Sequence, residues 1–76
     1  MITVEIKHED NNGREFGYGI YVNGYIWDDE FDSPMPVGMY ASECVPFGQN
    51  TSENIKKAER RVKRAAMRRY KQEFVG

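Results

Sequence analysis

The sequence predicts an α+β fold: an antiparallel meander of three strands, or four, packed on one long C-terminal helix. Residues 1–31 alternate apolar and polar positions and contain turn signals, which is typical of antiparallel strands. Residues 52–74 contain neither glycine nor proline and repeat apolar side chains at helical spacing. A chain of 76 residues is long enough for one domain, so we expect residues 1–76 to form a single unit.

The meander begins with residues 2–8, where β-branched apolar side chains alternate with polar ones. Two further alternating runs, 16–22 and 25–31, meet across Asn23-Gly24. Asn-Gly between two such runs favours a type I′ hairpin turn, because both central residues of that turn need a positive φ. The predicted register pairs Val22 with Tyr25, Ile20 with Trp27, Tyr18 with Asp29, and Phe16 with Phe31.

A three-residue loop at 11–13 would connect the first two strands and place Ile2, Val4 and Ile6 on the same face as these pairs. The opposite face is then thinly covered and acidic, and it is either solvated or a binding surface. Its predicted members are Thr3, Glu5, Lys7, Gly17, Gly19, Tyr21, Ile26, Asp28 and Glu30.

Residues 32–50 form the connecting segment, which is too long for a plain loop in so small a domain. Its apolar side chains predict a short fourth strand or a helical turn near residues 37–45. Three prolines and two glycines in the segment rule out a long element.

Residues 51–75 are predicted to form a basic amphipathic helix that begins at an N-cap, with Asn50, Thr51 or Ser52 in that role and Glu53 in capping-box spacing. Its last turns are expected to project beyond the sheet, with Arg69 and Glu73 paired four residues apart. The predicted core stripe consists of Ile55, Ala58, Val62, Ala65 and Ala66.

The residue inventory argues against catalysis and against a bound metal. His8 and Cys44 are the only residues of their kinds, and no neighbouring residue orients or activates them as a nucleophilic pair. One cysteine and one histidine cannot complete a closed zinc site, and the acidic run 28–32 lacks the spacing of a calcium-binding loop. We expect a protein that is not an enzyme and uses no metal and no cofactor.

A single cysteine excludes an intramolecular disulfide, whereas small secreted domains usually contain several. The N-terminal residues do not have the pattern of a signal peptide. No apolar run approaches the roughly 20 residues that cross a bilayer. We therefore expect a cytoplasmic protein that does not interact with a membrane.

Charge is segregated along the chain. Residues 1–50 carry two basic and nine acidic side chains, a net charge of −7, whereas residues 51–76 carry nine basic and three acidic ones, a net charge of +6. The helix would present a basic row about 20 Å long at 1.5 Å per residue. This row is either a partner-binding face or a face that is charged for solubility. We predict partner binding through Lys57, Arg60, Arg61, Arg64, Arg68 and Lys71, with Lys56 and Lys63 alongside.

A meander followed by a helix is similar in outline to two nucleic-acid-binding modules. The arm-binding domain of phage-type integrases reads DNA with its open sheet face, where this chain would offer Glu5, Asp28 and Glu30 in place of arginine and lysine. Double-stranded RNA-binding domains have a helix before the first strand, which this chain lacks. In size and charge separation the chain also resembles small phage and mobile-element proteins, including anti-CRISPR and anti-restriction factors.

The most plausible function is therefore that of a small macromolecule-binding protein, an inhibitor or adaptor with a protein partner. The alternative is a nucleic-acid-binding module that uses the same helix, and a homodimer between the two oppositely charged surfaces is a further alternative. A second candidate surface consists of Tyr21, Ile26, Asp28 and Glu30.

Overall fold

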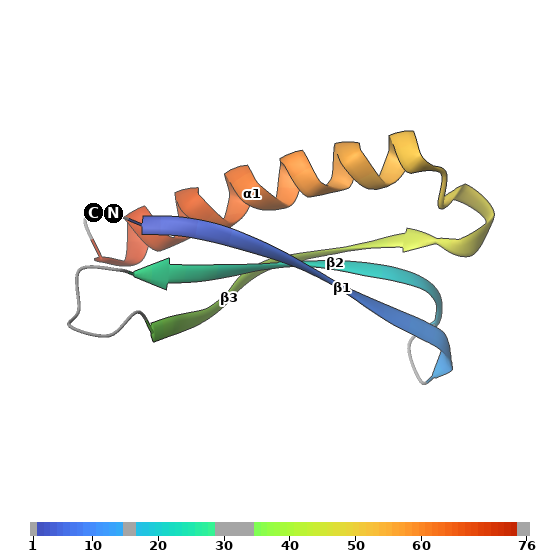
Figure 1. The fold of residues 1–76 in the computed structure, drawn as a ribbon, viewed down its shortest axis with the longest axis horizontal. Coiled ribbons are helices and arrows are strands. Elements are labelled where there is room, and N and C mark those ends of the chain that lie inside the picture. Colours follow the sequence, from blue (N-terminus) through green and yellow to red (C-terminus); the bar gives the residue numbers. More distant parts are fainter. Residues whose placement is uncertain (1, 15–16, 29–34, 75–76) are drawn as a thin grey trace.

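The structure is a computed structural model of the 76-residue chain, and it describes residues 2–14, 17–28 and 35–74. Its elements are, in chain order, β1 (Ile2–Arg14), β2 (Gly17–Asp28), β3 (Met35–Pro46), the short 3₁₀ helix η1 (Phe47–Gln49) and α1 (Ser52–Phe74). The strands form one antiparallel sheet in the order β1-β2-β3, and α1 runs back along one face of it (Figure 1). The predicted α+β fold is confirmed, with three strands.

The predicted hairpin at Asn23-Gly24 is wrong, because β2 passes straight through these two residues. The strand predicted near residues 37–45 forms as β3, but it is the third strand and not the fourth, and at 12 residues it is the long element that the prolines and glycines were expected to rule out. The predicted loop at 11–13 belongs to β1. Val22 therefore pairs with His8 and Glu43, not with Tyr25, and the predicted pair of Ile20 with Trp27 does not form. The two remaining predicted pairs involve Phe16, Asp29 and Phe31, which lie outside the described residues.

Gly24 is buried beneath α1, and this position explains its place in the middle of a strand. A Cβ atom at Gly24 would lie 2.7 Å from Val62 Cγ1 and 3.3 Å from Ala66 Cβ. Among the described glycines only Gly38 has a positive φ, so Gly24 does not adopt the conformation of a type I′ turn. Its lack of a side chain allows the helix and the central strand to approach closely.

The core lies between α1 and the helix-facing side of the sheet. Val22 packs with Val45, Ala58 and Val62, and Ile26 packs with Ala66 and Tyr70. The stripe on α1 follows a spacing of four residues through positions 58, 62, 66 and 70, so Ala65 falls beside it and is exposed, contrary to the prediction.

The end of α1 stays on the sheet up to Tyr70, so the predicted overhang is not seen there. Tyr70 is 7% exposed, and its ring meets the Tyr40 ring edge to face at 5.7 Å. Arg69 lies over the other side of this contact: its Nη1 donates a 3.5 Å hydrogen bond to the Tyr40 carbonyl, and its Cζ is 5.9 Å from the Tyr40 ring centroid. Arg69 is thus directed to Tyr40 of β3, and the predicted ion pair of Arg69 with Glu73 is not among those of the described residues.

The N-terminus of α1 is capped by Thr51, one of the three predicted caps. The backbone N–H of Asn54 donates to Thr51 Oγ1 at 3.2 Å, and the N–H of Ile55 donates to the Thr51 carbonyl at 3.0 Å. The first of these bonds satisfies an amide that has no partner within the helix.

Candidate functional site

The side of α1 opposite the core stripe faces solvent and carries a row of cationic side chains. Their spacings follow the helical period of about 3.6 residues per turn. The row extends over about 22 Å at 1.5 Å per residue. All its members are exposed, and none makes an ion pair or hydrogen bond with another of the described residues. This basic ridge consists of Lys56, Arg60, Lys63, Arg64, Arg68 and Lys71.

Two residues of the predicted binding face form ion pairs with acidic side chains of the same chain. Lys57 Nζ lies 3.4 Å from Glu53 Oε1, one turn earlier on α1. Arg61 binds Glu43 of β3 in a bidentate manner, with Nε to Oε1 at 2.9 Å and Nη2 to Oε2 at 3.0 Å. Both cations are partly neutralised, whereas the other four predicted residues, Arg60, Arg64, Arg68 and Lys71, lie on the ridge with Lys56 and Lys63.

Two acidic side chains of α1, Glu59 and Glu73, flank the ridge and point away from it, whereas Glu53 lies one turn before its first member and pairs with Lys57. Glu59 lies beside β1, with Oε2 3.5 Å from His8 Nε2. Glu73 lies near the Tyr40 phenol, on the side of β3, and acts on its pKa. Partial burial raises the pKa of this phenol above its ordinary 10.0, the Glu73 carboxylate raises it further, and the Arg69 guanidinium lowers it. From Lys56 to Lys71 the ridge therefore keeps a single sign of charge.

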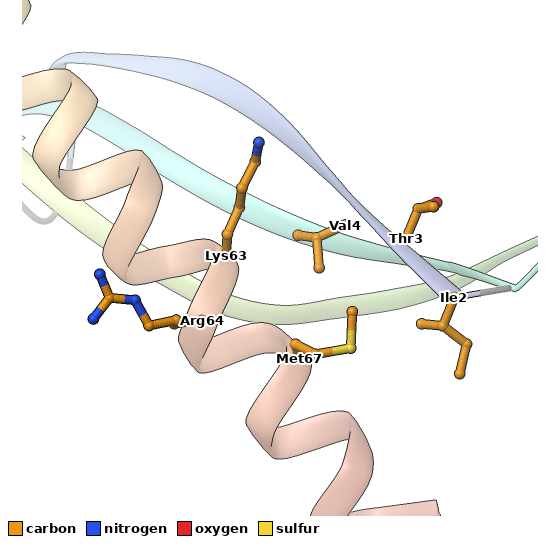
Figure 2. Close-up of a pocket in the computed structure, with 6 residues that line it drawn as sticks. All are labelled: Ile2, Thr3, Val4, Lys63, Arg64 and Met67. Atoms are coloured by element: carbon orange, nitrogen blue, oxygen red, sulfur yellow. The ribbon is translucent and has the colours of Figure 1, made fainter.

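An open groove of about 410 Å³ runs between β1 and α1 (Figure 2). Met67 extends from α1 towards the first residues of β1, where Ile2 and Val4 are half-buried. Lys63 and Arg64 form the helix side of its rim. The groove is thus lined by apolar side chains, with two cationic side chains on its helix side.

The predicted second surface is not formed as one surface. Ile26 is 0% exposed and Asp28 is 8% exposed, and both lie on the helix-facing side of β2. Tyr70 Oη donates a 3.4 Å hydrogen bond to Asp28 Oδ2. Tyr21 lies on the opposite side of the sheet, and Glu30 is outside the described residues. The predicted surface depended on a turn at Asn23-Gly24. Because β2 continues without this turn, each residue of β2 after Gly24 lies on the side of the sheet opposite to the predicted one.

The face of the sheet away from α1 carries an aromatic row on the central strand that the predicted register concealed. Tyr21, Tyr25 and Trp27 all lie on this face of β2, and Lys7 Nζ lies 5.3 Å from the Tyr25 ring centroid. Between the tyrosines, Asn23 is 6% exposed and accepts a 2.6 Å hydrogen bond from Ser42 Oγ. Unbroken alternation through residues 20–27 was the signal for this row.

The two residues considered for nucleophilic catalysis lie on opposite faces of the sheet. His8 pairs with Val22 on the helix-facing side, whereas Cys44 pairs with Tyr21 on the other. Within residues 2–14, 17–28 and 35–74, no three metal-ligating side chains gather. The part of the chain that the structure describes contains no helix both long and apolar enough to cross a bilayer.

Comparison with known proteins finds no family model, no curated protein and no solved structure that matches the chain. The inference of function therefore depends on the chemistry of the surface. Of the surfaces described above, the basic ridge has the strongest charge and the largest number of side chains without a described partner.

Proposed function

We propose that this protein is a non-enzymatic binding protein, an inhibitor or adaptor, whose basic ridge docks on an acidic surface of a partner protein. The observation that carries the proposal is the set of six exposed cations that make no ion pair with a described residue. Charges of one sign on a rigid helix give electrostatic steering and favour an oppositely charged surface. Arginine at positions 60, 64 and 68 suits bidentate contact with carboxylates.

Three features favour a protein over a nucleic acid. The first turn of α1 carries Glu53, and the Thr51 side chain occupies the Asn54 amide, so this helix start does not favour a phosphate. None of the described residues on the ridge is aromatic, so the ridge offers no stacking platform for bases. The net charge of −1 gives the whole chain no long-range attraction for a polyanion.

The second candidate function is nucleic-acid binding through the same ridge. It is favoured by one observation: the ridge is a row of cations about 22 Å long at 1.5 Å per residue, which would follow a phosphate backbone.

We also propose a cytoplasmic location, which is supported by the exposed free thiol of Cys44.

Affinity capture with two baits tests the proposal: the wild-type protein and the charge-reversed variant R60E/R64E/R68E. Quantitative mass spectrometry should find at least one protein that is enriched by the wild type and lost with the variant. Unchanged circular dichroism of the variant would show that it is folded, as expected for exposed substitutions. If every captured protein is retained by both baits, the proposal is wrong.

Titration of labelled duplex DNA and RNA into the wild-type protein at about 50 mM salt distinguishes the two candidate functions. Tight binding that weakens steeply with added salt and is lost in R60E/R64E/R68E would support the nucleic-acid module. The protein-binding proposal predicts no saturable binding in this titration.

A further inference from the structure

The two edges of the sheet differ in how they are protected from pairing with another strand. β3 forms one edge, and it contains Pro36 and Pro46. Its register against β2 shifts twice, so that Val37 and Tyr40 are extra residues, each in a bulge. Prolines and bulges are common devices that prevent strand addition at an edge.

The other edge, β1, has none of these devices between Ile2 and Asn11, and its one register shift lies beyond Asn11. It contains no proline, and its register against β2 is regular from Ile2 to Asn11. No described residue pairs with its outer side, since β1 is the first strand of the sheet order. Ten regular residues with a free row of backbone N–H and C=O groups form a template for a further strand.

The apolar side chains of this edge are incompletely covered by the monomer. Ile2, Val4 and Ile6 point to the helix-facing side but remain half-exposed, and the groove beside Met67 lies over the first two of them. The buried apolar core is small, with seven side chains among the described residues. Additional apolar burial at β1 would therefore contribute substantially to stability.

We propose that two copies of this chain pair through β1, antiparallel, about a two-fold axis that passes beside Ile6 and is perpendicular to the sheet. Charge complementarity of β1 with itself identifies the second copy as the occupant. In this register Glu5 lies opposite Lys7 of the second copy, and Lys7 lies opposite its Glu5. Ile6 lies opposite Ile6 on the helix-facing side, so one apolar pair forms at the axis, while Val4 lies opposite His8.

The neighbouring registers are less favourable. The register centred on Glu5 places Glu5 opposite Glu5, and the register centred on Lys7 places Lys7 opposite Lys7. The register centred on His8 pairs Lys7 with Glu9 but places His8 opposite His8 on the helix-facing side. Only the register centred on Ile6 combines two opposite-charge pairs with an apolar centre among these.

The dimer would have a continuous six-stranded sheet with both helices on the same side. Asp10 of the second copy falls opposite Ile2, close to the groove whose rim carries Lys63 and Arg64. The basic ridge lies on the solvent side of α1, so pairing through β1 leaves Arg60 and Arg68 free for a partner protein. This inference does not depend on the proposed function.

Sedimentation equilibrium of the full chain tests the dimer. The wild type should sediment as a dimer. E5K and K7E should each raise its dissociation constant about tenfold or more, because each places two like-charge pairs at the interface. The double variant E5K/K7E should restore the wild-type value, since it re-forms both pairs in reverse. A monomeric wild type, or a double variant no better than the single ones, would overturn the proposal.

Two further variants keep the test specific. E9K should leave the dimer unchanged, because Glu9 faces Thr3 in the proposed register, whereas the register centred on His8 predicts a loss. K7E also removes the contact of Lys7 with the Tyr25 ring, but a folding defect from that cause would not be repaired by E5K. R60E/R68E, which leaves both cations of the groove rim unchanged, should remain dimeric, so failure of the ridge and failure of the edge are separable.

Discussion

At the scale of single residues, Gly24 decides how closely the helix and the sheet pack. The space that a side chain would need is filled by Val62 and Ala66, both of which are buried. Asn23 next to it faces the other side and bonds Ser42 of β3. Asn-Gly thus has two separate roles in the middle of a strand, and neither is a turn.

Gly24→Ala should lower the free energy of unfolding by about 1–3 kcal/mol, because its Cβ would lie too close to a β-branched side chain in a packed core. Gly48→Ala is the matched control: no atom lies within 4 Å of the added Cβ, and the change in stability should be below about 1 kcal/mol. Urea unfolding of both variants checks this. Equal stability of the two variants would contradict the close packing at Gly24.

Tyr40 should make stability fall at high pH. Because its folded-state pKa is raised above 10.0, the folded state holds the phenolic proton more tightly than the unfolded state. This contribution is present below the unfolded pKa and is lost as pH rises through the folded one. Urea unfolding at about pH 8 and about pH 10.5 should show a smaller loss of stability for Tyr40→Phe than for the wild type. An identical loss in both proteins would refute this role.

At the scale of elements, the helix could be predicted closely from the sequence and the strands could not. The bounds of α1 follow from the glycine-free run and the Thr51 cap, which are local signals. The faces of β2 depend on whether the chain turns at Gly24, and both Ile26 and Trp27 are apolar, so either face assignment gives a plausible pattern. Only contact with Val62 and Ala66 of α1 decides between them.

The cap itself gives a test at this scale. Thr51→Ala should lower the free energy of unfolding by about 1 kcal/mol, because the Asn54 amide loses its acceptor. Ser52→Ala, at the next position and also exposed, serves as the control and should cost less than about 0.5 kcal/mol. Thermal unfolding followed by circular dichroism measures both. A larger loss for Ser52→Ala would place the start of the helix elsewhere.

At the scale of the whole molecule, the unpaired cations of α1 gather on one outer surface. The basic ridge lies on the outer side of α1, while Glu5 and Glu9 lie on the side of the sheet away from the helix. The sequence predicted the basic face from spacing alone. It could not show that Arg61 is paired, since Glu43 is 18 residues from Arg61 and meets it only through the packing of α1 on β3. The pair of Lys57 with Glu53 follows from their spacing of four on one helix.

This difference between free and paired cations leads to the central claim, that the unpaired ones carry partner binding. The most direct measurement is the dissociation constant of the captured partner protein for two variants with the same change in net charge, R60Q/R64Q and K57Q/R61Q. The first should weaken binding about tenfold or more, and the second by less than about threefold. Equal weakening by the two variants, or a larger effect of K57Q/R61Q, would contradict the claim.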